Sequence, residues 1–331
     1  MHSTISTVRL AWLTLGVNVL IILQGAVVRI SGSGAGCGSH WPLCNGEVVP
    51  FAASTETLVE YSHRLLSFGA LVLGGWLLSR AFRSRRAGPA FFGAASAAFA
   101  FLILEALLGA ATVLLGLTGD NATVGRGLLV ATHLVNSVLL IGALTVTLIY
   151  ARPNAPGAPK LRGQGLVGAT LSVGLVGMLL LTFSGGVAAM GNTIFPSESL
   201  AAGLAADFDA ASHLLIRLRV LHPLIAISVG LYLFLSLGLS WWLKPVPQAR
   251  DVARLLFGVY VAQLLVGTLN LAFLGPVGLQ LLHLLLAVLS FSLLSALIVF
   301  TLGLPATAGG RAATVWRHDR RELATEERGA R

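Results

Sequence analysis

The stretch LVEYSHRLLSFGALVLGGWLLSR, residues 58–80, combines a long apolar run with ionisable side chains near its start. About 20 consecutive, mostly apolar residues are enough for a helix to cross a bilayer. Glu60 and His63 are three residues apart, so on a helix they share one face. Ionisable groups inside hydrocarbon are costly and usually functional. The stretch therefore predicts a membrane-spanning helix with a ligand site near one end.

The whole chain has the composition of an integral membrane protein. Of its 331 residues, 56% are hydrophobic and 11% are charged, and the mean hydropathy is +0.85. Soluble domains carry about twice that share of charge. We expect an all-α membrane protein with eight transmembrane helices. The predicted spans are residues 9–29, 58–80, 89–117, 127–150, 165–187, 211–240, 252–273 and 277–302.

Basic residues set the expected orientation. The chain has 22 Lys and Arg against 13 Asp and Glu, a net charge of +9, and most bases follow the second, fourth and sixth spans or lie in the tail. Because basic loops stay on the cytoplasmic side, we expect both termini in the cytoplasm, and no nucleic acid as partner. Loops 30–57 and 188–210 then face outward. Residues 303–331 form a basic cytoplasmic tail.

Two short motifs recur in the second half of the chain. They are QGAV (24–27) with SGGV (184–187), and EALLG (105–109) with QLLVG (263–267). An internal repeat of this kind predicts two duplicated four-helix bundles. The N-terminal half covers residues 1–150 and the C-terminal half covers residues 151–302.

Four histidines lie near the starts of the even-numbered spans, at similar expected depths below the outer surface: His63, His133, His222 and His283. A single buried histidine is more often a hydrogen-bonded core residue than a ligand. Two histidines on facing helices of a bundle, however, can bind one haem iron from opposite faces. We expect one haem in each half, near the extracytoplasmic side. Zinc is disfavoured, because the set lacks close histidine spacing and has no cysteine at that depth.

The two halves differ beside these histidines. Glu60 precedes His63 by three residues, whereas Arg217 and Arg219 precede the corresponding histidine of the second half. Arginine suits a haem propionate, while a carboxylate repels one and can instead accept a proton. We therefore expect a resident haem in the second half and a reacting haem in the first. The alternative is that Glu60 only makes local hydrogen bonds or pairs with Arg64.

The only two cysteines, Cys37 and Cys44, lie in the first outer loop. On the oxidising face of a membrane such a pair favours a disulfide, which would rigidify a cap over the first half. The alternative is two free thiols.

Taken together, the motifs resemble the haem A synthase family, membrane enzymes that convert haem O to haem A. The matching stretches are QGAVVR (24–29), the Cys37 to Cys44 loop with WPLCNG (41–46), Glu60-x-x-His63-Arg64, ATH (131–133), LH (221–222) and the late His283.

The resemblance implies a division of labour between the halves. His63 and His133 would hold haem O as substrate, with Glu60 near the C8 methyl that is oxidised to a formyl group by successive hydroxylations. His222 and His283 would hold a haem b that relays electrons. Implied partners are a haem O synthase that delivers the substrate, a membrane electron acceptor or donor, oxidase assembly factors, the lipid of the cell membrane and a second copy of the chain. A di-haem b-type electron-transfer cytochrome and a haem transport or chaperone protein remain open as alternatives.

Overall fold

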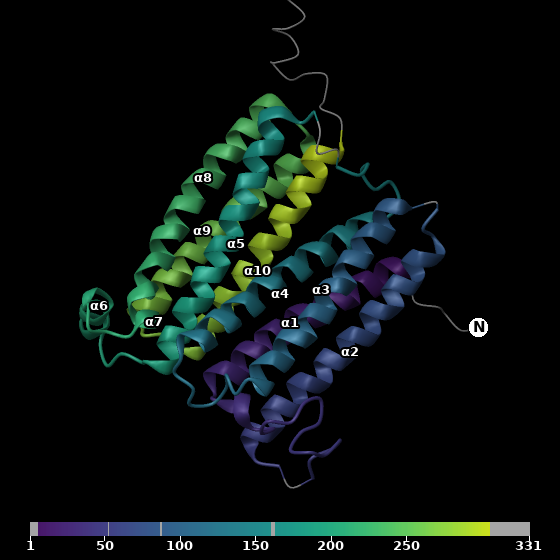
Figure 1. Cartoon of the computed structure of the whole chain (residues 1–331). Coiled ribbons are helices and arrows are strands. Elements are labelled where there is room, and N and C mark those ends of the chain that lie inside the picture. The colour runs from purple at the N-terminus through teal and green to yellow at the C-terminus, as the bar shows by residue number, and fades with distance from the viewer. Residues whose placement is uncertain (1–5, 52, 87, 160–162, 305–331) are drawn as a thin grey trace, which may run out of the picture.

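The computed structural model describes residues 6–51, 53–86, 88–159 and 163–304 (Figure 1). Within these residues the fold is helical without strands, and the single isolated bridge joins Cys44 and Glu47. All eight predicted spans are confirmed as helices long and apolar enough to cross a membrane. They are α1 (Thr7–Ile30), α2 (Thr55–Arg83), α3 (Pro89–Leu114), α4 (Val124–Tyr150), α5 (Gly165–Ile194), the composite crossing Leu214–Leu243, α9 (Pro247–Ala272) and α10 (Val277–Gly303). Most of the predicted basic tail, from residue 305 on, lies outside the described residues.

Local sequence explains where most helices begin. The hydroxyl groups of Ser6, Ser54 and Thr123 accept hydrogen bonds from the first turns of α1, α2 and α4, as N-cap residues do. Pro89 and Pro247 start α3 and α9, where a missing N–H costs nothing. The predicted bounds were therefore close, with errors of a few residues at several ends.

The second outer loop and the sixth crossing differ from the prediction. The fifth helix continues to Ile194 instead of ending at residue 187, because no residue before Pro196 stops it, and α6 (Leu200–Phe208) follows. The sixth crossing consists of α7 (Leu214–Arg217), the 3-10 turn η2 (Leu218–Val220) and α8 (Leu221–Leu243). Pro223 explains the break, because proline cannot donate to the carbonyl group four residues earlier.

The helices pack as two neighbouring groups (Figure 1). Helices α1 to α4 contact one another in a ring, α1–α2, α2–α3, α3–α4 and α1–α4, and α5, α8, α9 and α10 do the same. Each group has its own apolar core, one around Leu77 and Ile141 and the other around Met178 and Leu256. The duplication of a four-helix bundle stays a prediction, but the same ring of contacts in both groups is the packing that a duplication would produce.

Helices α4 and α10 join the two groups. A Cβ on Gly142 of α4 would lie 2.8 Å from Ser295 Oγ and 2.9 Å from a Phe291 ring atom, so only glycine allows this close approach. Nearby, the hydroxyl groups of Thr145 and Ser292 share a hydrogen bond of 2.8 Å. The packing of α4 on α10, together with that of α4 on α5, therefore holds one group of helices against the other.

All four predicted histidines lie within the first three turns of α2, α4, the sixth crossing and α10. Because successive crossings run antiparallel, these four starts lie at one end of the molecule, which also carries the loop residues 31–51 and α6 (Figure 1). At 1.5 Å rise per residue the histidines are about 9–14 Å inside the helix starts. The fold therefore places them in a common layer.

Candidate functional site

Each of the four histidines packs against a glycine of the preceding membrane-spanning helix. The pairs are Gly25 with His63, Gly109 with His133, Gly185 with His222 and Gly267 with His283. A Cβ would lie 3.2 Å from the imidazole at Gly25, 3.9 Å at Gly109, 2.9 Å at Gly185 and 2.8 Å at Gly267. At Gly25, Gly185 and Gly267 the missing side chain leaves room for the imidazole itself, so each ring packs directly against the backbone of the neighbouring helix.

The second-half histidines face each other directly. The ring centroids of His222 and His283 are 6.2 Å apart and the ring planes are nearly perpendicular, at 87°. Metal–imidazole bonds are about 2 Å long, so two such bonds together with the two ring half-widths roughly span this distance. The pair can therefore hold one metal ion between them. In the first half, His63 and His133 are close enough to interact electrostatically.

Three of the histidines have a polar partner on the neighbouring helix. Ser184 Oγ is 3.2 Å from His222 Nδ1, and Gln263 Nε2 is 3.3 Å from His283 Nε2. In the first half, Glu105 of α3 holds a carboxylate oxygen against Nδ1 of His133. Partners of this kind orient histidine ligands and raise their basicity when they are carboxylates.

Glu105 is a site residue that the sequence prediction missed. It occupies the motif position where the second half has Gln263, four residues before the glycine that faces the histidine. The sequence could have identified Glu105, because it is an acidic residue within an apolar span and the repeat aligns it with a neutral amide.

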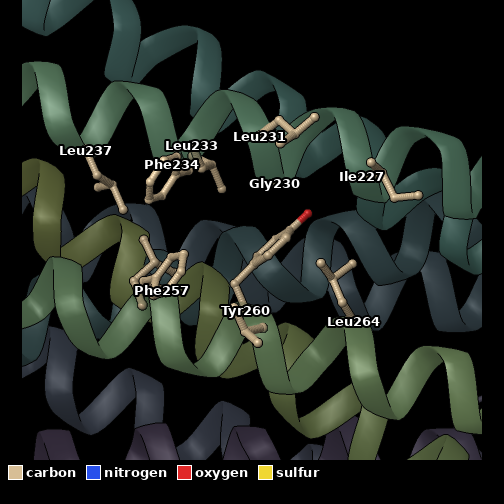
Figure 2. A pocket seen from close by; sticks show the side chains of 11 residues that line it. Ile227, Gly230, Leu231, Leu233, Phe234, Leu237, Phe257, Tyr260 and Leu264 are labelled. Carbon is tan, nitrogen blue, oxygen red and sulfur yellow. The ribbon is translucent and has the colours of Figure 1, made fainter.

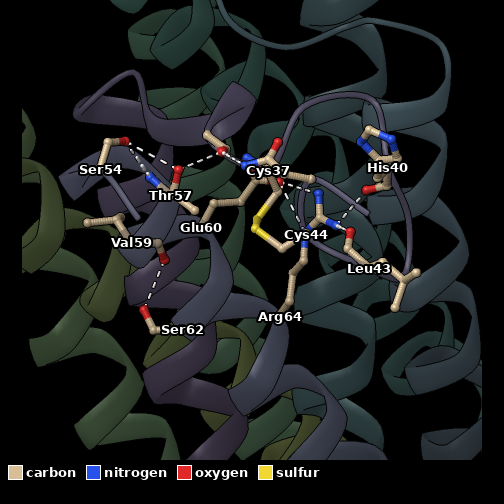
Figure 3. The surroundings of a disulfide bond; sticks show 12 residues. Cys37, His40, Leu43, Cys44, Ser54, Thr57, Val59, Glu60, Ser62 and Arg64 are labelled. Carbon is tan, nitrogen blue, oxygen red and sulfur yellow. Dashed lines mark hydrogen bonds and ion pairs between the residues drawn. A yellow bond between two sulfur atoms is a disulfide. The ribbon is translucent and has the colours of Figure 1, made fainter. Parts of the chain in front are cut away.

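Glu60 lies buried beneath the outer loop, with only 4% of its surface exposed (Figure 3). Its Oε2 accepts a hydrogen bond of 2.8 Å from the backbone N–H of Cys37, and its Oε1 pairs with the Arg64 guanidinium. Arg64 also donates to the carbonyl groups of His40 and Leu43, both at 2.7 Å. The pairing with Arg64 that the sequence left open is therefore present, and Glu60 anchors the loop as well as lying one turn from His63.

The predicted disulfide between Cys37 and Cys44 is confirmed (Figure 3). The loop it closes is fixed to the start of α2, because Thr57 Oγ1 donates to the carbonyl oxygen of Gly36 at 2.7 Å. A Cβ on Gly36 would lie 2.5 Å from the Glu56 backbone, so no other residue fits there. The disulfide loop is thus a rigid cap on the first group of helices.

The two predicted propionate-binding arginines have different surroundings. Arg219 is buried, and its guanidinium binds Asp207 at 2.7 Å and Asn192 at 2.9 Å, so a carboxylate of the chain already compensates its charge. Arg217 is exposed at the end of α7. His213 caps α7 by accepting the N–H of Leu215 at 3.2 Å, which gives this histidine a structural role.

A separate apolar groove of about 340 Å³ lies between α8 and α9 (Figure 2). Its one polar side chain, Tyr260, donates its hydroxyl to the Ala226 carbonyl at 2.7 Å. The groove has no lining histidine or acid, so it offers no group for chemistry.

The residues present fit a haem rather than a metal cluster. No group of three or more His, Cys, Asp or Glu that could hold a metal gathers within the described part of the chain. Paired histidines with glycines beside them are the donor set of a haem bound from both faces. In addition, Nδ1 of His63 and of His283 is buried without a hydrogen-bond partner among the described residues.

The fold defines a polytopic membrane protein that brings four histidines into one layer. Residues 8–295 match the model of the COX15-CtaA family, described as cytochrome oxidase assembly protein. The chain belongs to this family.

Similar proteins carry two different names. A Thermus thermophilus protein named protoheme IX farnesyltransferase is 47% identical over 281 residues, which are 84% of this chain and 45% of that protein. A heme A synthase of Alkalihalophilus pseudofirmus is 42% identical over 102 residues, 30% of this chain and 33% of that protein. A heme A synthase of Bacillus cereus is 43% identical over 98 residues, 30% and 32% of the two chains. The match thus covers less than half the length of each of these relatives.

Proposed function

We propose that this protein is a haem A synthase, which oxidises a methyl group of haem O to the formyl group of haem A. Family membership and the relatives named heme A synthase support this proposal. The four glycine–histidine pairs supply two sites for a haem. In this proposal His63 and His133 hold the substrate, and His222 and His283 hold a resident haem b.

The positions of two carboxylates are the reason for assigning the substrate to the first half and the resident haem to the second. Glu105 contacts His133 and Glu60 lies one helical turn before His63, whereas the corresponding positions of the second half are Gln263 and Arg219. A site that only transfers electrons needs no proton acceptor, but oxidation of a methyl group releases protons that a nearby carboxylate can take up. The first half is therefore the reaction site.

Glu60 is suited to act on a water molecule at that site. An ionised carboxylate offers about four lone-pair positions, and Cys37 N–H, Arg64 Nε and Arg64 Nη2 occupy three of them. The remaining position can accept a proton from water, while Arg64 and the disulfide loop hold the carboxylate in one orientation. Glu60 thus acts as a base or as an electrostatic stabiliser.

The conversion consists of two successive oxidations. The first inserts oxygen and gives an alcohol, and the second gives a hydrated aldehyde that loses water. Each oxidation removes an electron pair and releases protons, and the electrons pass to a membrane-bound acceptor. Haem b supplies one-electron transfer when it is bound. With water as the source of oxygen, ¹⁸O-water should label the alcohol intermediate, whose oxygen does not exchange with solvent, and label from ¹⁸O₂ there instead would disprove this route.

Farnesyl transfer is a second candidate, because the Thermus relative bears that name. Transfer from a prenyl diphosphate requires carboxylates that bind Mg²⁺ together with the phosphates. The described part of this chain brings no such cluster together, and the match covers 45% of the relative. The geometry favours oxidation over prenyl transfer.

The deciding experiment is expression with and without a supply of haem O, followed by extraction of the haem. The proposal predicts haem A only when haem O is supplied. Unchanged haem in both cultures would instead identify a di-haem b-type electron-transfer cytochrome, and release of unmodified haem would identify a transport or chaperone protein.

The proposed function implies a location in the cell and a set of partners. The protein spans the membrane several times, and we place it in the plasma membrane with both termini in the cytoplasm and the haem sites near the outer face. Residues 1–150 and 151–302 form the two halves. A haem O synthase supplies the substrate, and oxidase assembly factors, a membrane electron acceptor or donor and a second copy of the chain are further partners.

A further inference from the structure

Arg29 at the end of α1 extends from the first group of helices into the second. Its Nη1 donates to the Ala189 carbonyl oxygen at 3.1 Å and to the Thr193 hydroxyl, both on α5. Its Nη2 donates to Gln280 Oε1 of α10 at 2.9 Å. The guanidinium therefore lies between α5 and α10, the helices that carry Gly185 and His283.

Within the described part of the chain, no carboxylate compensates the charge of Arg29. Its acceptors there, a carbonyl, a hydroxyl and an amide oxygen, are neutral, and a second cation, Arg126, is close enough to repel it. By contrast, Arg64 pairs with Glu60 and Arg219 pairs with Asp207. An uncompensated cation in a partly buried position is costly unless an anion binds it.

Arg29 also has donors to spare. A guanidinium carries five N–H groups, and the three bonds above leave Nε–H and one N–H of Nη2 without an acceptor among the described residues. These two remaining donors are available to the oxygens of a carboxylate.

The position of Arg29 identifies the carboxylate. Ala189 is one helical turn beyond Gly185, which touches His222, and Gln280 is one turn before His283. One turn is about 5.4 Å along a helix. The guanidinium thus lies one turn toward the loop end from the second pair of histidines, where the acidic side chains of a tetrapyrrole would reach it.

We infer that Arg29 binds a propionate carboxylate of the haem held by His222 and His283. This inference rests on the proposed function and deepens it: a helix of the substrate half completes the resident haem site of the other half. A lipid phosphate has related chemistry, and the experiment separates the two sources.

The test uses full-length protein purified in detergent, as wild type and as Arg29→Gln, Arg29→Lys and the control Arg254→Gln. Arg254 is a suitable control because it is exposed and makes only a 3.7 Å surface pair with Asp251. Two quantities are measured: the midpoint potential of the second-half haem, and the rate of haem transfer to excess apomyoglobin. Both are repeated with haem whose two propionates are methyl esters.

Arg29→Gln should lower the midpoint potential, because removal of a cation disfavours the reduced, less positive haem. It should also speed haem loss about tenfold or more, the factor expected for one charge-assisted hydrogen bond. Arg29→Lys should keep most of the potential because the charge remains, and Arg254→Gln should match wild type. With the dimethyl ester, wild type and Arg29→Gln should lose haem at the same rate, because the ester leaves no carboxylate for Arg29 to bind.

Four results would overturn the inference. An Arg29→Gln protein with unchanged potential and haem loss would leave Arg29 as a bridge between helices only. An effect of equal size on haem loss with the dimethyl ester would exclude the propionate. An effect that appears only when phospholipid is added back would also exclude it and would point to lipid phosphate. Wild-type protein that binds no haem would overturn the proposed function as well. If wild-type protein binds haem normally, a negative result for Arg29→Gln overturns only the inference about Arg29. Comparing haem with its ester in wild type keeps the test valid if Arg29→Gln does not fold.

Discussion

Exchanging the polar partners of two histidines should shift the redox properties of the two sites in opposite directions. Glu105 contacts His133 in the first half, and Gln263 contacts His283 in the second. Glu105→Gln and Gln263→Glu alter one charge and keep the side-chain volume. Each substitution gives one half the partner that the other half already has, so the chain supplies its own matched control.

The expected size follows from the strength of the two kinds of hydrogen bond. A bond to a charged group contributes about 1.5–3 kcal/mol and a neutral bond about 0.5–1.5 kcal/mol. The difference of about 1.4 kcal/mol corresponds to a factor of ten, or about 59 mV for a one-electron couple. A carboxylate makes the imidazole a stronger donor and so favours ferric iron. Glu105→Gln should therefore raise the potential of the first-half haem by about 60 mV, and Gln263→Glu should lower that of the second by a similar amount.

Potentiometric titration of the haem-loaded protein, followed in the visible spectrum, measures both values. The double exchange should bring the first-half potential up and the second-half potential down in one protein. In the Glu105→Gln protein, the haem content of the second-half site should stay close to that of wild type, because only the partner of a first-half histidine changes. Potentials that move by less than about 15 mV, or in the same direction for both exchanges, would refute the role assigned to these partners.

Three further substitutions test other parts of the site. Glu60→Gln should retain haem but abolish haem A in extracted pigment, and a normal yield would show that Glu60 only anchors the loop. Cys44→Ser should lower the free energy of unfolding by about 2 kcal/mol, because the disulfide restricts the unfolded chain. Thermal melting measures this change. Wild-type protein with its disulfide reduced is the control and should melt as Cys44→Ser does. Gly185→Ala places a methyl group 2.9 Å from the His222 ring and should reduce haem content, whereas Gly238→Ala, with nothing within 4 Å, should not. Equal haem content in these two glycine variants would exclude a tight fit beside His222.

The number and kind of elements could be predicted from sequence because a bilayer leaves the chain few options. Inside hydrocarbon every backbone polar group must be satisfied within the chain, so a long apolar run becomes a helix. The same reasoning identified His63 and its three counterparts, because polar residues in such runs are rare. The break near Pro223 was missed although its signal is present, since a run of the right length hides a local 3-10 turn.

The side-chain partners could not be predicted in the same way. Arg219 was expected to bind a propionate, but Asp207 of the preceding segment lies against it. Glu105 was seen only as a repeat position, although it meets a histidine on the next helix. Both contacts depend on how far each helix is rotated about its axis and where a loop folds back, which no local pattern specifies.

The sequence by itself determined eight crossings, a layer of four histidines and a cysteine pair able to form a disulfide, because hydrophobicity, helical period and redox environment act over short stretches. Only the tertiary structure decided that the Cys37 N–H of the outer loop binds Glu60, and that Arg29 of the first half reaches α5 and α10 of the second. These relations depend on how the outer loop folds over the start of α2 and on how the two groups of helices pack against each other, which no local pattern specifies.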